Sequence, residues 1–257
     1  MIGAIAGDII GSVYERHNIK VADFSLFNPG CTFTDDSVLT VAIADAILSG
    51  TGYGGKLREY YRRYPEKGYG AGFRRWAAAG RITPYNSNGN GSAMRVSPVG
   101  FAFIAMEDVQ REAKRSAEVT HNHPEGITGA QAVASAVFMA RMGSSKEEIK
   151  SYIKDTYQYN LSDPLDNIRK HYRFDVTCAG SVPQAITAFL ESEGYEDAIR
   201  KAISIGGDSD TIACIAGGIA EAFYGGVPAN IESFALARLD DDLRAIISEF
   251  SQKYRIH

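Results

Sequence analysis

The sequence predicts an all-α protein, because its apolar residues recur with helical periodicity and strict alternation of apolar and polar residues is scarce. The apolar segments are rich in alanine, a strong helix former, and have the length of ordinary globular helices. Clusters of Gly, Pro, Asn and Ser separate them. These observations favour a compact multi-helix array and argue against a β-sandwich or a βαβ architecture.

The first element is expected to be a buried helix over residues 1–15. Its apolar run lacks the basic start of a signal peptide, and Asp8 interrupts it well before the roughly 20 residues that span a bilayer. Further helices are predicted over residues 37–48, 127–141, 181–191 and 211–224. The stretches 50–55, 68–72 and 85–91, rich in Gly, Tyr and Asn, are predicted to be surface loops.

The last forty residues are predicted to form an amphipathic closing helix. Asp240, Asp241 and Asp242 lie on it. A run of like charges inside a helix usually occupies a solvated face, so we assign these three aspartates to the surface and not to a metal site.

Glycines recur every four residues in the first predicted helix, at Gly3, Gly7 and Gly11, and a pair lies inside a later one, at Gly217 and Gly218. Glycine costs a helix roughly 1 kcal/mol relative to alanine. Close contact between helix backbones is the usual compensation. The glycines therefore predict tightly packed helices and say little about chemistry.

Composition limits the classes of function. With 257 residues, 45% of them hydrophobic, the chain is expected to form a single domain over residues 1–257. A formal net charge of -4 argues against an extended nucleic-acid-binding surface, although a local basic pocket stays open. Three widely spaced cysteines indicate neither a disulfide framework nor a thiolate zinc site, and a cytoplasmic location with no membrane association is expected.

The first chemical motif is Thr34-Asp35-Asp36, placed immediately before a strongly helical run. Thr and Asp are preferred helix N-caps, and acids in the first turn suit the helix dipole. Two adjacent carboxylates preceded by a hydroxyl nevertheless exceed what capping needs. They resemble a site for a hard cation with oxygen ligands.

A second motif, Asp208-Ser209-Asp210-Thr211, follows Gly206 and Gly207 and precedes another apolar helix. Alone, it could again be a helix cap, and its spacing does not match a calcium-binding EF-hand loop. Both motifs combine hydroxyl and carboxylate side chains at the start of a predicted helix, and they lie far apart in the sequence. Two helix N-termini that converge could therefore share bound metal, and we predict a metal-dependent hydrolase.

Asp8 and Glu15 supply further acids in the first predicted helix. A spacing of seven would place both carboxylates on nearly the same face, two turns apart. Lone buried acids are costly, so each is expected to have a partner: either an arginine in a salt bridge or the metal site.

Residues 86–95 read as a glycine-rich loop that leads into a helix, where backbone N–H groups could hold a phosphate. Arg95 is available for an anion or for an internal carboxylate. His121 and His123 lack the further nitrogen or thiolate ligands of a zinc site, so a structural or substrate-orienting role is favoured.

Together these motifs resemble the ADP-ribosylglycohydrolase family, which includes dinitrogenase reductase-activating glycohydrolase and the ADP-ribosyl-acceptor hydrolases. They occur in the family's order between residue 3 and about residue 228. The matching segments are Gly7-Asp8-Ile9-Ile10-Gly11-Ser12-Val13-Tyr14-Glu15, Phe33-Thr34-Asp35-Asp36-Ser37, Gly89-Asn90-Gly91-Ser92-Ala93-Met94-Arg95, Thr120-His121 followed by Gly129 and Ala130, and Gly206-Gly207-Asp208-Ser209-Asp210-Thr211-Ile212.

The resemblance implies an all-α fold with a binuclear magnesium or manganese centre that binds the distal ribose of ADP-ribose. The implied metal ligands are Thr34, Asp35, Asp36, Asp208, Asp210 and Thr211. Glu15 would gate or complete the site, and Glu15, Asp35 or Asp36 could serve as general base. The implied substrate-binding residues are Asn86, Ser87, Asn88, Gly89, Asn90, Gly91, Ser92, Met94 and His121.

The implied reaction is hydrolysis at the anomeric carbon of the distal ribose, which releases ADP-ribose from a protein or a small-molecule conjugate. The ending Ser12-Val13-Tyr14-Glu15 of the first motif favours O-linked, serine-type substrates over arginine-linked ones. A free ADP-ribose ester and a nucleic-acid end stay open as substrates. Two rival functions are a non-catalytic ADP-ribose-binding protein and a two-metal phosphoester hydrolase.

Overall fold

The computed structural model describes residues 1–80 and 83–254, and every regular element in that part of the chain is a helix. The one pairing of extended backbone recorded there is an isolated bridge between Gly89 and Thr177. The all-α prediction is confirmed. The helices are α1 (Ile2–Gly11), α2 (Asp35–Ser49), α3 (Tyr53–Arg63), α4 (Ala71–Ala78), α5 (Gly91–Met94), α6 (Ser97–Ala102), α7 (Met106–Glu118), α8 (Pro124–Arg141), α9 (Lys146–Tyr157), α10 (Leu165–His171), α11 (Cys178–Leu190), α12 (Tyr195–Ser204), α13 (Ser209–Tyr224), α14 (Ala229–Leu236) and α15 (Asp241–Tyr254).

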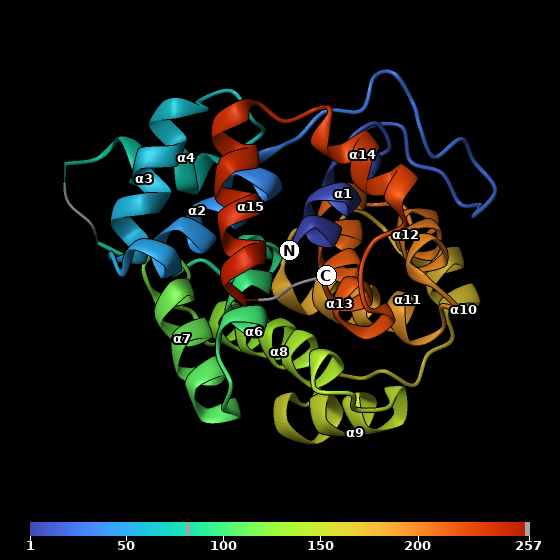
Figure 1. Cartoon of the computed structure of the whole chain (residues 1–257). Coiled ribbons are helices and arrows are strands. Elements are labelled where there is room, and N and C mark those ends of the chain that lie inside the picture. The colour runs from blue at the N-terminus through green and yellow to red at the C-terminus, as the bar shows by residue number, and fades with distance from the viewer. Residues whose placement is uncertain (81–82, 255–257) are drawn as a thin grey trace.

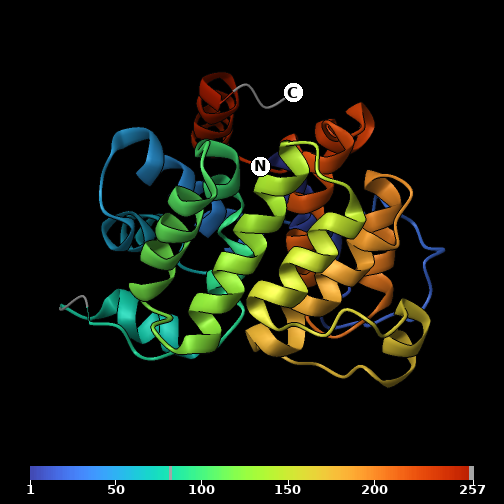
Figure 2. The same cartoon turned by 90° about the horizontal axis from the view of Figure 1, so that it is seen from below.

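The helices α1 and α13 lie at the centre of the molecule, between α2 to α4 at one end and α10 to α12 at the other (Figure 1). Every residue of α1 is buried, as is α13 as far as Glu221. Figure 2 shows α7, α8 and α9 side by side across a second face, where α8 also contacts α13. These two buried helices thus form a shared core around which the others pack.

Glycines allow α1 and α13 to approach with their backbones in contact. A Cβ atom on Gly7 would lie 2.1 Å from the carbonyl oxygen of Ala213, and one on Gly11 would lie 2.6 Å from the Cα of Asp210. On the facing helix, a Cβ on Gly217 would lie 2.3 Å from the carbonyl oxygen of Gly3. The expected close helix contact is therefore present, and it places α1 against the residues that follow Asp208.

The helices predicted in the middle of the chain are confirmed as α2, α8, α11 and α13, each beginning two or three residues earlier than expected. Polar N-cap residues account for three of these earlier starts. The side chains of Thr34, His123 and Thr177 each accept a hydrogen bond from a backbone N–H in the first turn of α2, α8 and α11, respectively.

Two expectations about helix extent are wrong. The first helix ends at Gly11, because the Ser12 hydroxyl donates to the carbonyl of Ile9 and accepts from the N–H of Thr32, which turns the chain away. The single closing helix is instead two helices, α14 and α15. They are separated near Asp240, whose side chain accepts from the N–H of Leu243 and so starts α15; residues 255–257 lie outside the described residues.

Parts of all three predicted loops are helical, since α3 begins at Tyr53, α4 at Ala71 and α5 at Gly91. Asp241 and Asp242 lie on the surface as expected, with side chains 94% and 74% exposed. Within the described residues, the helices are too short or too polar to cross a membrane.

The contact between α1 and α13 predicts opposite effects for two glycine-to-alanine substitutions. Gly7→Ala should lower the free energy of unfolding by about 2 kcal/mol, because the new methyl group overlaps the backbone of α13. Gly55→Ala should raise it by up to about 1 kcal/mol, because Gly55 lies in α3 with no atom within 4 Å of its would-be Cβ. Urea denaturation measures both; equal effects would contradict the packing account.

Candidate active site

The N-terminus of α2 is held by a carboxylate from α1. Asp8 is fully buried and accepts hydrogen bonds from the Thr34 N–H at 3.0 Å, the Thr34 hydroxyl at 2.6 Å and the Ser37 N–H at 3.1 Å, and from the Ser37 hydroxyl. Hydroxyl and amide donors thus replace the arginine partner that was considered for Asp8. Burial raises the pKa of Asp8, and these hydrogen bonds oppose that shift.

The second acidic motif begins α13 after a turn in which Gly206 and Gly207 both adopt a positive φ, of 73° and 74°. A side chain on Gly207 would also collide with the ring of Tyr172, since its Cβ would lie 2.4 Å away. Asn90 donates to Asp208 at 2.6 Å. The turn and this amide together orient the motif toward α2.

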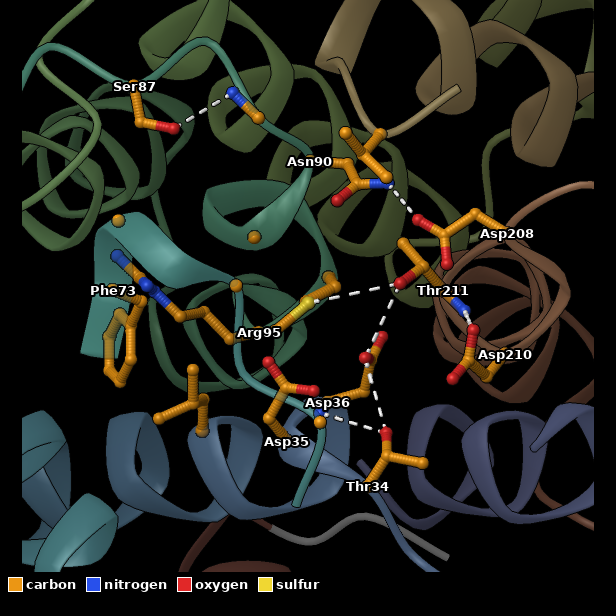
Figure 3. Close-up of a pocket in the computed structure, with 18 of the residues that line it drawn as sticks. Thr34, Asp35, Asp36, Phe73, Ser87, Asn90, Arg95, Asp208, Asp210 and Thr211 are labelled. Carbon is orange, nitrogen blue, oxygen red and sulfur yellow. Dashed lines mark hydrogen bonds between the residues drawn. The ribbon is translucent and has the colours of Figure 1, made fainter. Parts of the chain in front are cut away.

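The two motifs meet (Figure 3). The Thr211 hydroxyl on α13 lies 3.4 Å from Oδ2 of Asp36 on α2, as does the Thr34 hydroxyl. Carboxylate oxygens of Asp8, Asp36 and Asp210 lie within 4.8 Å of one another, and those of Glu15, Asp208 and Asp210 form a second such group. Asp210 belongs to both groups, so the predicted convergence of two helix N-termini is present.

These carboxylates lack a neutralising partner. The salt bridges recorded for the described residues involve none of them, and Oδ1 of Asp36 is buried without a hydrogen-bond partner. Burial, and then the neighbouring carboxylate of Asp8, raise the pKa of both Asp35 and Asp36 well above the ordinary value. Burial, and then Asp36, do the same for the pKa of Asp210.

A divalent cation fits this arrangement. Hard cations prefer carboxylate and hydroxyl oxygens, and a bound cation would supply the missing partner for the orphaned Asp36 oxygen. The structure thus holds two overlapping acidic groups that can accommodate metal.

Glu15 lies in the same region, but it is not on the first helix, where the sequence predicted it. It lies beyond the end of α1, in the turn that follows, so Asp8 and Glu15 do not share a helix face. Its side chain is half-buried and lines the cavity described below. Burial, and then the charge of Asp208, raise the pKa of Glu15 above its ordinary value.

A cavity of about 290 Å³ opens beside the acidic residues. Its walls come from the N-terminal parts of α2 and α13, from α4 and α5, and from five loop segments. The lining residues are Glu15, Thr34, Asp35, Asp36, Leu39, Gly68, Gly70, Gly72, Phe73, Tyr85, Ser87, Gly89, Asn90, Gly91, Met94, Arg95, His121, Phe174, Val176, Asp208, Asp210 and Thr211.

The glycine-rich loop is only partly directed into this cavity. Three of its predicted substrate-binding residues are bonded elsewhere. The N–H of Asn86 donates to Asn122 at 2.8 Å, the Asn88 amide donates to Glu125 at 3.1 Å, and the Ser92 hydroxyl donates to the carbonyl of Gly126 at 2.7 Å. The others line the cavity, namely Ser87, Gly89, Asn90, Gly91, Met94 and His121.

His121 and His123 have different roles in the structure, because only His121 lines the cavity. His123 is the N-cap of α8 and accepts from the N–H of Glu125 at 3.2 Å, which is a structural role. His121 is 4% exposed and lies in the cavity wall, with its ring centroid 5.9 Å from that of Tyr85.

Several lining residues were not predicted. Residues 68–72 and Phe73 form one wall, although the sequence suggested only a surface loop there. Phe174 and Val176 are half-exposed apolar residues that also line the cavity, beside the bridge between Gly89 and Thr177. Exposed aromatic or aliphatic residues in a loop were the available signal, but the sequence does not show which loops meet.

The fold and the site define a class of protein: an all-helical chain whose carboxylates gather at two helix N-termini, where they can hold metal beside a cavity for a small molecule. The family model described as ADP-ribosylglycohydrolase matches residues 1–255. The chain belongs to this family of hydrolases, as the sequence motifs predicted.

Individual relatives agree with this assignment. The chain is 27% identical over 305 residues to ADP-ribosylhydrolase ARH3 of Homo sapiens, covering 88% of this chain and 84% of the relative. It is 25% identical over 257 residues to ADP-ribosylarginine hydrolase Tri1 of Pseudomonas putida (strain GB-1), covering 88% and 69%. A solved ADP-ribosylglycohydrolase-related protein complex has the same fold, with a TM-score of 0.73 at 22% identity over 99% of this chain and 96% of that one.

The crowded carboxylates predict a pH-dependent stability in metal-free protein. Between the ordinary carboxyl pKa and the raised pKa values of Asp35, Asp36 and Asp210, the folded chain binds more protons than the unfolded chain. The free energy of unfolding should therefore fall as the pH rises through this range. Urea denaturation in EDTA from about pH 4 to about pH 8 measures the fall.

Excess Mg²⁺ should reduce this loss of stability at the upper end of the range, because a bound cation stabilises the ionised carboxylates. Asp36→Asn should make the decline in EDTA shallower, since it removes one of the crowded acids. Identical pH profiles for EDTA-treated and Mg²⁺-loaded protein would contradict this reading of the site.

Proposed function

We propose that this protein hydrolyses the bond between C1″ of the distal ribose of ADP-ribose and an acceptor, with two Mg²⁺ or Mn²⁺ ions as cofactors. The observation that carries the proposal is that Asp36 lies beside Asp210 and Thr211, and that its buried Oδ1 has no hydrogen-bond partner among the described residues. A family of hydrolases that act on ADP-ribose provides the reaction class.

The proposed metal ligands come from the two motifs, and Asp210 would contribute to both ions because it belongs to both acidic groups. When bound, the ions would orient the ribose hydroxyls and make a water molecule more acidic. The remaining ligands would be Thr34, Asp35, Asp36, Asp208 and Thr211. Asp8 is a positioning residue in this scheme, because its hydrogen bonds hold Thr34 and the first turn of α2.

Among Glu15, Asp35 and Asp36, we favour Glu15 as the general base. Its carboxylate lines the cavity and has no recorded hydrogen-bond donor among the described residues, whereas Asp36 faces the Thr34 and Thr211 hydroxyls. A raised pKa, which Glu15 shares with Asp35 and Asp36, makes the ionised carboxylate a stronger base than an ordinary one. Glu15 would accept the proton of the attacking water in the part of the cavity next to Asp208 and Asp210.

The rest of ADP-ribose would extend from the acidic end along the glycine-rich loop. Ser87, Gly89, Asn90 and Gly91 line this part of the cavity, and glycines there permit close approach of a diphosphate. His121 would provide a hydrogen-bonding group beside them.

For the acceptor, we propose O-linked, serine-type ADP-ribose as the preferred substrate over arginine-linked ADP-ribose. The support is the Ser12-Val13-Tyr14-Glu15 segment, of which Glu15 lines the cavity and Tyr14 is anchored by a hydrogen bond to the carbonyl of Ser25. This segment follows α1 and so contributes to the opening of the acidic end. An ADP-ribosylated protein or a small conjugate would be the substrate, and ADP-ribose the product.

The direct test is to incubate the protein with serine-linked, arginine-linked and acetyl-ester ADP-ribose, each in the presence of Mg²⁺, Mn²⁺ or EDTA. The amount of released ADP-ribose is then measured. We expect release that requires metal, with the serine-linked substrate fastest. ADP-ribose binding without release from any substrate would indicate a non-catalytic binding protein. Turnover of generic phosphoesters with ADP-ribose conjugates intact would indicate a two-metal phosphoester hydrolase.

Asp210→Asn and Asp36→Asn should each lower turnover by at least about 100-fold, because each removes a proposed direct ligand, and even outer partners of a metal matter 10- to 100-fold. Asp241→Asn is the matched control: it makes the same chemical change at a side chain that is 94% exposed. Equal losses in all three variants would contradict the assignment of acids to site and surface.

A further inference from the structure

Arg95 is a fully buried cation in the wall of the cavity, next to Asp35 and on the side away from Asp208 and Asp210 (Figure 3). Its Nη2 donates to the carbonyl of Ser116 at 3.1 Å and to the hydroxyl of Thr120 at 2.8 Å. Among the described residues it has no carboxylate in a salt bridge, and its Nε and Nη1 have no hydrogen-bond partner. The recorded hydrogen bonds of this guanidinium are therefore directed at one short segment, at the end of α7.

The Thr120 hydroxyl lies between Arg95 and His121 and is within hydrogen-bond distance of both. The Thr120 hydroxyl oxygen lies 2.7 Å from Nδ1 of His121, and Thr120 is itself fully buried. An arginine can only donate, so the hydroxyl oxygen must accept from Arg95. Its single proton is then free to be donated, and within the described residues the recorded neighbour that can accept it is Nδ1 of His121.

This assignment determines the tautomer of the imidazole. If Nδ1 carried the proton, both Arg95 and His121 would donate to the Thr120 oxygen, and the buried hydroxyl proton would be left without an acceptor. Such a loss costs about 1–3 kcal/mol. With Nδ1 as acceptor, the Thr120 hydroxyl both accepts and donates a hydrogen bond, and the proton of a neutral ring lies on Nε2.

Nε2 lies at the glycine-rich loop. It is 3.2 Å from the position of a Cβ on Gly91 and 3.6 Å from that of a Cβ on Gly89, so the ring packs closely against the backbone of both glycines. No residue in the described chain is recorded as a hydrogen-bond partner of Nε2, although His121 lines the cavity. With this tautomer, a hydrogen-bond donor faces the cavity beside Gly89 and Gly91.

We propose that Arg95 and Thr120 are positioning residues that hold His121 as a neutral imidazole with its Nε2–H directed at an oxygen of the bound substrate. Burial lowers the pKa of His121 well below its ordinary value, and the charge of Arg95 adds to this shift, which agrees with a neutral ring. The identity of the oxygen rests on the proposed function: it would be a phosphate oxygen of the ADP-ribose diphosphate.

The tautomer can be measured on the protein without any ligand. In protein labelled with ¹⁵N-histidine, the His121 signals are identified as those missing from His121→Gln. We expect an unprotonated, hydrogen-bonded Nδ1 and a protonated Nε2. In Thr120→Val, which keeps the shape of the side chain but removes the hydroxyl, the hydrogen-bonded Nδ1 signature should be lost, and Thr120→Ser should restore it.

Ser116→Ala is the matched control. It removes another fully buried hydroxyl on the same turn, one that donates to the carbonyl of Ala113, while the Ser116 carbonyl that accepts from Arg95 is retained. The His121 signals should keep their tautomer in this variant. Affinity for ADP-ribose, measured by calorimetry with Mg²⁺ present, should fall about tenfold in Thr120→Val and remain close to the wild-type value in Thr120→Ser and Ser116→Ala.

A proton on Nδ1 in the wild-type protein, or unchanged His121 signals in Thr120→Val, would overturn the proposal. If Thr120→Val does not fold, the wild-type tautomer alone still decides. Failure of the proposed function is distinguishable: a wild-type protein that does not bind ADP-ribose but shows the expected tautomer would retain the positioning role and lose the assigned ligand.

Discussion

The contact between α1 and α13 is the constraint on which the rest of the structure depends. Backbones approach this closely only where glycines replace side chains, and the glycines of α1 recur at the spacing that keeps them on one face. Asp8 follows Gly7 and is thereby brought to the start of α2, while Gly11 lies against the backbone of Asp210. One packing interaction thus aligns two helix N-termini that are more than 170 residues apart in sequence.

Side chains of opposite charge are buried at the two ends of the cavity. At the acidic end, carboxylates are buried close together and form no salt bridge with any described residue, which opposes folding unless a cation is bound. At the other end, Arg95 is buried and forms no salt bridge within the described part of the chain, yet His121 remains neutral and hydrogen-bonded. A molecule with hydroxyl groups at one end and an anionic group farther along would complement both, as ADP-ribose does in the proposed function.

Much of this could be predicted from sequence, because it depends on local patterns. Alanine-rich segments with helical periodicity indicated the central helices. The occurrence of hydroxyl and carboxylate side chains in both acidic motifs indicated that the two motifs converge. What could not be predicted depends on tertiary contacts. The end of α1 at Gly11 is set by Ser12 bonding to a distant loop, which moved Glu15 off the helix. The cavity walls around Phe73 and Phe174 come from loops whose meeting no local pattern records.

The central claim is that metal and ADP-ribose occupy one site, built by α2 and α13. Linkage makes this directly measurable, because each ligand must then change the affinity for the other by the same factor. The measurement is calorimetric titration of ADP-ribose into the protein in EDTA and in saturating Mn²⁺, with the reciprocal titration of Mn²⁺. We predict that Mn²⁺ tightens ADP-ribose binding by at least about tenfold and that ADP-ribose tightens Mn²⁺ binding equally. Equal ADP-ribose affinities with and without Mn²⁺ would contradict a shared site.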